Sequence, residues 1–309
     1  MTAQTWIDET KNLLLTDYVE EHDVLATDVN DSATTLNFTY DTAGIVEGSL
    51  LEIGTELMYV FSVNATNNDA TVKRGFRGTT AAAHSSGDLV TVNPKFPVQI
   101  VLKAINDELA DLSSPQNGLY QMKTVELTFN AAQDGYNLTG VTDDILSIYQ
   151  VTYSDVGAEA SEPVISSWTL RRDRNTSSFA SGYALVLHDD GWPGQTIRVQ
   201  YKTDFAALAA TSTALSTVGL HASAYDLPSL GAALRLMSTR PVRREFIDEQ
   251  GSSRRAEEVP AGAISASMRD LRALRDTRIS AEATRLDQKY PLFWTRSGGK
   301  TQNSVYRGV

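Results

Sequence analysis

The stretch KRGFRGTTAAAHSSGDLV, residues 73–90, decides the first half of the fold. One apolar run, Leu57–Val63, precedes it, and a second, Leu89–Val92, closes it. Short apolar runs bounded by turn residues are typical of β-strands. The unusual backbone angles of the turns can be supplied by three glycines: Gly75, Gly78 and Gly87. This order of strand, turns and strand predicts a compact β module.

The same stretch carries side chains that could serve chemistry. Arg74 and Arg77 could hold a phosphate, but a Walker loop needs two glycines separated by four residues, followed by Lys and Ser or Thr. Gly75 and Gly78 are too close together for that loop, and the G-x-G-x-x-G pattern is also missing. His84 could act as a base, but no Ser/His/Asp order or Cys partner surrounds it. A structural turn is therefore favoured over a phosphate loop or a catalytic turn.

Composition limits the classes of protein that the chain can belong to. Its 309 residues are enough for two or three modules with their own cores. The absence of cysteine excludes disulfides, thiolate metal sites and Cys nucleophiles, and it fits assembly in a reducing cytoplasm. The N-terminal residues are too polar for a secretory signal, and no apolar run approaches the roughly 20 residues of a membrane span. We expect a soluble protein that is not secreted.

Charge divides the chain unevenly. The net charge is −11, yet residues 235–309 hold 15 Lys and Arg against 9 Asp and Glu. The body is therefore acidic and the C-terminal part basic. An acidic body argues against general DNA affinity, which needs clustered positive charge. The basic part can bind nucleic acid or an acidic partner surface.

Four segments have helical patterns. The first follows Thr5 and carries Trp6, Leu13 and Leu14 on one face. The second, Pro97–Leu112, has apolar residues at spacings of three and four. The third, Leu227–Glu249, contains Pro241, which would kink or break it, and the last is Ser265–Tyr290.

Strand patterns fill the two regions between these helices. The first region runs from Val24 to Val92 and the second from about Lys123 to Tyr201, where regular spacing predicts a β-sandwich or small barrel. The order of elements predicts an α+β fold, a discontinuous antiparallel helical bundle with two inserted β modules. The expected division is a helical core of 1–17, 95–118 and 206–292, β modules at 18–94 and 119–205, and a C-terminal docking segment at 293–309.

Other polar clusters are candidates for metal or carbohydrate sites. His188 and the two aspartates after it could bind a metal, but no second His lies nearby. Asp143 and Asp144 lack the alternating oxygens of a calcium loop, and Glu20–Asp23 is typical of a solvated loop. Dispersed carboxylates of a glycoside hydrolase remain open, as does carbohydrate binding by the second β module. We predict no catalytic residue, no metal and no cofactor.

Residues Ile53–Val92 resemble a small β module common in structural proteins of tailed bacteriophages. The similarity is carried by the Met-Tyr-Val strand, the run VKRGFRGTTAAAH and the GDLV ending. It implies that the protein is a virion component.

The order of helices resembles the head–tail connector, or adaptor, proteins of tailed bacteriophages. The segment RDLRALRDTRISAEATRLDQKYP, residues 269–291, carries most of this similarity, and large β insertions set the chain apart. The resemblance implies a non-enzymatic neck protein that forms a dodecameric ring, joins the portal to the tail and extends the DNA channel. Implied partners are further copies of the chain, the portal protein and tail, stopper or tail-terminator proteins, while DNA passes without specific binding. The alternative is a minor tail or baseplate protein whose β modules bind carbohydrate or other tail components.

The resemblance also implies which residues meet the portal or a neighbouring subunit. They are Arg269, Arg272, Arg275, Arg278, Arg285, Phe293, Trp294, Arg296, Tyr306 and Arg307. The arginines could equally form a solvated, ion-paired face with Asp270, Asp276, Glu282 and Asp287. The alternative for the segment 293–309 is an ordinary frayed terminus.

Overall fold

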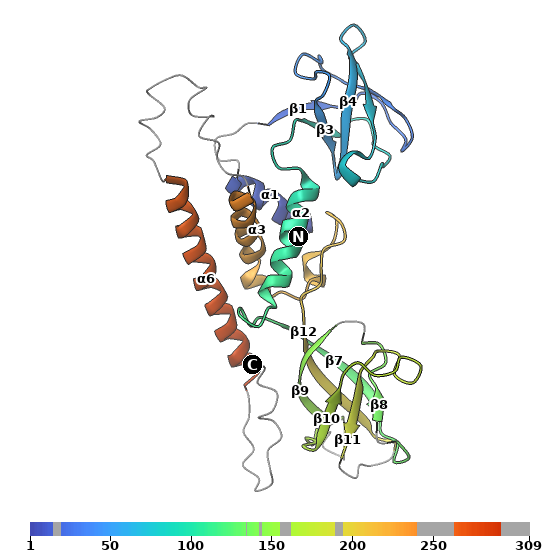
Figure 1. The fold of residues 1–309 in the computed structure, drawn as a ribbon, viewed down its shortest axis with the longest axis vertical. Helices are drawn as coiled ribbons and strands as arrows, with labels where there is room; N and C mark the ends of the chain where they lie inside the picture. Colours follow the sequence, from blue (N-terminus) through green and yellow to red (C-terminus); the bar gives the residue numbers. More distant parts are fainter. Residues whose placement is uncertain are drawn as a thin grey trace. The chain divides into compact units, whose positions relative to one another are not determined.

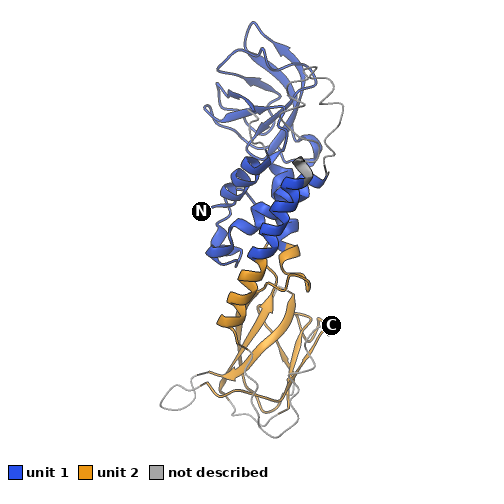
Figure 2. Cartoon of the chain, turned by 90° about the vertical axis from the view of Figure 1, so that its left-hand side faces the viewer, with its two compact units in different colours: residues 1–109, 207–278 blue, residues 110–206, 279–309 orange. Residues whose placement is uncertain are grey.

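The computed structural model describes residues 1–14, 20–133, 135–141, 144–154, 162–188, 194–239 and 263–291. The chain forms two compact units (Figure 2). Unit 1 comprises residues 1–109 and 207–278, and unit 2 comprises residues 110–206 and 279–309. The chain therefore passes between the units several times.

Four α-helices lie in the described residues (Figure 1). They are α1 (Ala3–Leu14), α2 (Val98–Leu112), α3 (Asp226–Thr239) and α6 (Ala263–Lys289). In unit 1, α1 packs against α3, where Ser229 donates a hydrogen bond to Glu9 at 2.9 Å. Trp6 of α1 is buried and meets the ring of Tyr225 edge to face, with the centroids 5.6 Å apart.

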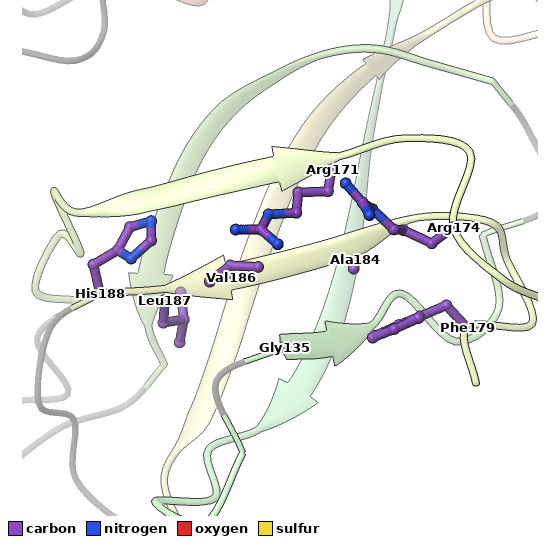
Figure 3. A pocket seen from close by; sticks show the side chains of 8 residues that line it. All are labelled: Gly135, Arg171, Arg174, Phe179, Ala184, Val186, Leu187 and His188. Atoms are coloured by element: carbon purple, nitrogen blue, oxygen red, sulfur yellow. The ribbon is translucent and has the colours of Figure 1, made fainter.

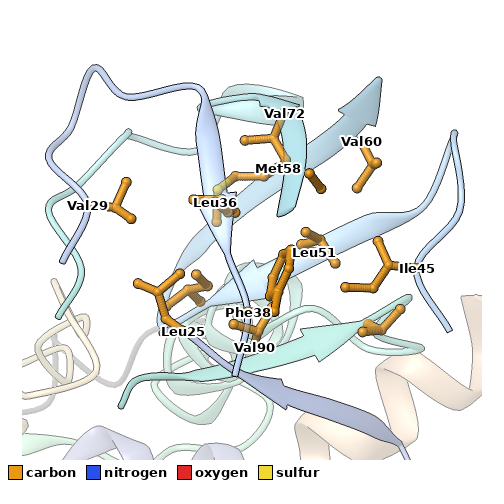
Figure 4. Packing of buried hydrophobic residues seen from close by; sticks show 13 residues of the cluster. Leu25, Val29, Leu36, Phe38, Ile45, Leu51, Met58, Val60, Val72 and Val90 are labelled. Carbon is orange, nitrogen blue, oxygen red and sulfur yellow. The ribbon is translucent and has the colours of Figure 1, made fainter. Parts of the chain in front are cut away.

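Unit 1 also contains a six-stranded antiparallel sheet with the strand order β1-β6-β3-β4-β5-β2. Its strands are β1 (Glu21–Val24), β2 (Thr35–Asn37), β3 (Leu50–Ile53), β4 (Glu56–Asn64), β5 (Asp69–Lys73) and β6 (Leu89–Val92). The sheet curls into a half-barrel and encloses a hydrophobic core (Figure 4). Leu36, Leu51 and Met58 are fully buried there. This core holds the module together, because apolar burial is the main favourable term in folding.

Unit 2 has two three-stranded antiparallel sheets that share one core. Their orders are β10-β11-β8 and β7-β12-β9. The strands are β7 (Gln121–Thr128), β8 (Gly135–Asn137), β9 (Ile145–Tyr153), β10 (Trp168–Arg171), β11 (Ala184–Leu187) and β12 (Thr196–Thr203). Every second residue of β12 is buried, as a sheet with one face on the core requires.

The predicted fold class, a discontinuous antiparallel helical bundle with two inserted β modules, is wrong. The fold is mixed, with few helices and mainly antiparallel sheets, and two of its hydrophobic cores lie inside the sheets. The apolar residues of α6 explain the error. Leu274 is 48 % exposed and Met268 and Leu271 are half-buried, whereas Ile279 and Leu286 are buried. Such a helix offers no continuous apolar seam for a bundle.

Several local predictions are confirmed. The second helix is α2, the strands around residues 73–90 are β4 and β6, and the last helix is α6. The third helix begins as predicted, but α3 ends at Thr239, and Pro241 lies outside the described residues.

The buried core of the six-stranded sheet predicts the effect of a cavity. Leu51→Ala should lower the free energy of unfolding of this sheet by about 3 kcal/mol, because Leu51 is fully buried. Hydrogen exchange of the β3 and β4 amides measures it. Leu89→Ala is the control, since Leu89 is 55 % exposed in the same sheet. Equal effects of the two variants would show that Leu51 is not part of the core.

Candidate functional site

The segment 73–90 folds around one buried carboxylate. Glu56, the first residue of β4, is 1 % exposed. The guanidinium of Arg74 donates to both of its oxygens, from Nε to Oε1 and from Nη2 to Oε2, at 2.8 Å each. The ring of His84 lies 2.8 Å from Oε2. The backbone N–H groups of Gly75 and Ala82 add two hydrogen bonds of 3.1 Å. The segment is thus wrapped around Glu56.

The remaining donors of Arg74 are also occupied. Its Nη1 donates to the carbonyls of Asn30 at 2.7 Å and Ala33 at 2.9 Å, and its Nη2 donates to the carbonyl of Ala82 at 2.5 Å. The Arg74 side chain is 7 % exposed and that of His84 is 8 % exposed. Both side chains are therefore covered. Arg74 joins the start of β4 at Glu56 to the carbonyls of Asn30 and Ala33 and to that of Ala82.

Electrostatics keep Glu56 ionised. Burial works to raise the pKa of its carboxyl, but the hydrogen bonds from Arg74, Ala82, His84 and Gly75 outweigh burial and lower this pKa to about 2. A carboxyl with so low a pKa holds no proton near neutral pH. Glu56 is therefore unsuited to general acid catalysis.

The turn itself needs its first glycine. Gly75 has φ 61°, and a Cβ there would lie 2.9 Å from the carbonyl oxygen of Thr79. Gly78 has φ 82° but faces open space, while Arg77 is exposed, with its guanidinium 5.9 Å from the centroid of the Phe76 ring. Arg74 and Gly75 belong to the Glu56 network, and Arg77 and Gly78 lie on its exposed side.

A second buried carboxylate joins the helices of unit 1. Glu108 of α2 is 1 % exposed. It accepts hydrogen bonds from Arg275 of α6 at 2.6 Å and from Arg235 of α3 at 3.1 Å. Burial raises the pKa of Glu108, and the two arginines oppose that rise. Gly231 makes the room, because a Cβ there would lie 1.9 Å from the carboxyl carbon of Glu108.

A third glutamate fixes the start of α2. Glu52 of β3 is 3 % exposed and accepts the backbone N–H of Val98 at 2.6 Å. Negative charge is stabilised at a helix N-terminus. Lys11 lies 3.5 Å away, and burial still raises the pKa of Glu52. The same solution, a carboxylate in an apolar setting held by N–H donors, thus recurs at three places.

The arginines of α6 that were expected to form an interface divide into three groups. Arg275 and Arg278 face inward to Glu108 and Asp226, the latter at 2.7 and 3.0 Å. Arg285 pairs with Glu282 at 2.8 Å, as the ion-paired alternative predicted. Arg269 and Arg272 are exposed.

Sequence reasoning missed Glu108 and Asp226 as partners. The position of Glu108 in the sequence indicates a buried carboxylate, because it lies on the apolar face of its helix, three residues after Ile105 and seven after Val101. A buried carboxylate needs a cation or other donors close to it.

The C-terminal end of α6 is anchored within unit 2. Tyr290 lies edge to face with Tyr149, whose hydroxyl donates to the carbonyl of Pro291 at 2.8 Å. Lys202 lies 3.9 Å from the centroid of Tyr120, and burial together with the charge of Asp287 raises the pKa of Tyr120 to about 12. The predicted interface residues Phe293, Trp294, Arg296, Tyr306 and Arg307 lie outside the described residues.

The other polar clusters considered from the sequence lie only partly within the described residues. Within the described ranges, no group of three or more His, Asp or Glu side chains could hold an ion. His188 contacts the hydroxyl of Thr169 at 2.8 Å, and Asp144 accepts a hydrogen bond from Tyr183. Asp143, Asp189 and Asp190 lie outside the described residues. None of the described helices is long and apolar enough to cross a membrane.

Comparison with known proteins adds no assignment. No protein-family model matches the chain, and no curated protein matches it.

Glu56 predicts a specific dependence of stability on pH. Its pKa is about 2 in the folded chain against an ordinary 4.5, so its contribution is complete above pH 4.5 and is lost as the pH falls to about 2. The size is about 3 kcal/mol. Glu56→Gln should therefore destabilise the protein at neutral pH, and the gap to wild type should close in acid. Denaturant unfolding at several pH values measures it.

The matched control is Glu47→Gln, since Glu47 is exposed between strands β2 and β3 of the same sheet. It should leave the pH profile unchanged. A constant gap between the Glu56→Gln variant and wild type from neutral pH to pH 2 would refute the buried, ionised state of Glu56.

Gly231 predicts a reversal of the usual helix rule. Gly→Ala inside a helix normally stabilises by about 1 kcal/mol. Gly231→Ala should instead destabilise by about 2 kcal/mol, because its Cβ would overlap Glu108. In a Glu108→Ala background the same substitution should become stabilising. Thermal unfolding of the four proteins tests this, and a stabilising Gly231→Ala in the wild-type chain would disprove the overlap.

Proposed function

We propose that the chain is a structural neck protein of a tailed bacteriophage virion. It forms a homo-oligomeric ring that joins the portal to the tail and extends the DNA channel. Its mechanism is assembly through protein contacts, without a chemical step.

The contacts of Arg74 and His84 with Glu56 support this proposal most directly. The residues of the 73–90 segment that looked most like chemistry, Arg74 and His84, are covered and bonded to Glu56. The segment that resembles a phage structural module thus stabilises a β module from within. Polar side chains that are paired inside the fold fit a structural role better than a catalytic one.

Charge supports an assembly through unlike surfaces. The part of the chain before residue 235 is strongly acidic, and the part after it is basic. Arg269 and Arg272 are exposed on α6 and are suited to meet the acidic surface of a neighbouring copy. Acidic walls would also let DNA pass without binding it.

The residues after Pro291 supply the contact with the portal in this proposal. Tyr149 and Tyr290 fix the chain up to Pro291. Beyond it, Phe293 and Trp294 are aromatic residues of the kind that dominate interface energy, and Arg296 and Arg307 add positive charge.

Deletion of Phe293–Val309 tests this contact. The shortened chain should lose co-sedimentation with the portal protein of its virus, because the aromatic and basic anchors are gone. Its circular dichroism and thermal unfolding should match those of the full chain, since the deletion keeps the hydrogen bond from Tyr149 to Pro291. A control chain with Phe293 and Trp294 kept and only Val305–Val309 removed should bind more strongly than the full deletion. Undiminished portal binding by the full deletion would sink the docking proposal.

A further inference from the structure

The outer face of the β10-β11-β8 sheet holds a cavity of about 610 Å³. Alternation along the strands explains its lining. Leu170 and Leu185 face the core, whereas Arg171, Ala184 and Val186 lie on the opposite face. The volume falls in the range typical of small-molecule sites.

Two arginines line this cavity without being used elsewhere. Figure 3 shows Arg171 and Arg174 on the same side of the sheet, between His188 at one end and Phe179 at the other. Among the described residues, no side-chain hydrogen bond or ion pair engages either guanidinium. Two unpaired cations beside one cavity repel each other, and an anion would relieve that repulsion.

The other arginines of unit 2 that lie in its described residues are engaged, which sets this pair apart. Arg172, between the two in sequence, donates to the carbonyls of Ile145 at 2.5 Å and Leu146 at 2.8 Å. Arg198 pairs with Glu126 at 3.3 Å and with Glu162. At the end of β10 and in the turn after it, Arg172 is therefore bonded to the fold, while Arg171 and Arg174 lie at the cavity.

The rest of the lining is suited to the apolar C–H face of a ring. Phe179 lies over Gly135, where a Cβ would come within 3.5 Å of the aromatic ring. Ala184 and Val186 add small apolar side chains to the lining. His188 is held by its contact with Thr169 at 2.8 Å and offers a further polar edge. Aromatic and apolar surface beside charged donors is the usual make-up of a site for a polar ring.

We propose that this cavity binds a sugar unit that carries a carboxylate or a phosphate group. Arg171 and Arg174 hold the anionic group through charge-assisted hydrogen bonds. Phe179 and the apolar floor contact the ring of the sugar. This binding activity is separate from the neck role and does not depend on it.

Methyl NMR titration of the full chain tests the proposal, with Ala184 and Val186 as reporters inside the cavity. The probes are glucuronate, glucose 6-phosphate, glucose and inorganic phosphate. Glucuronate, glucose 6-phosphate or both should shift these methyl signals, and glucose should not. Whichever anionic sugar binds identifies the carboxylate or the phosphate as the recognised group.

Variants separate recognition from general charge. Arg171→Gln and Arg174→Gln should each weaken binding about tenfold, the loss expected for one charged hydrogen bond. Arg77→Gln removes the same charge at an exposed site in unit 1 and should bind as wild type does. The proposal is overturned if neither anionic sugar shifts the cavity methyls, if Arg171→Gln and Arg174→Gln bind normally, or if inorganic phosphate binds as well as glucose 6-phosphate while glucuronate does not bind.

Discussion

A buried carboxylate has to be paired, and this constraint organises the structure. Glu52, Glu56 and Glu108 are each at most 3 % exposed. An unpaired buried charge would cost several kcal/mol, so each of them collects N–H donors from distant parts of the chain. Arg74 crosses the β module to reach Glu56, and Arg275 crosses from α6 to reach Glu108. These pairs join parts of unit 1 that are far apart in the sequence.

The same constraint bears on function. The ion pairs inside the fold engage Arg74, His84 and Arg275. The net charge differs between the two parts of the chain, before and after residue 235. The acidic body and the basic C-terminal part suit contacts between unlike surfaces, whether of two copies or of a copy and the portal. Arg171 and Arg174 differ from these paired side chains, because no side-chain hydrogen bond or ion pair engages them among the described residues.

Much of the local structure was predictable from the sequence, and the tertiary arrangement was not. The spacing of Pro97–Leu112 and the runs around residues 73–90 predicted α2, β4 and β6, since periodicity reports which face is buried. The predicted helical bundle is wrong because it requires the apolar residues of α6 to form one buried face, whereas Leu274 is 48 % exposed. Glu56 and Arg74 stand 18 residues apart, and spacing alone says nothing of a pair at that distance.

Electron microscopy of the purified chain mixed with the portal protein of its virus tests the proposed assembly of a ring on the portal. If the chain assembles in this way, class averages will show a twelvefold ring that caps the portal. A monodisperse trimer that leaves the portal bare would contradict it.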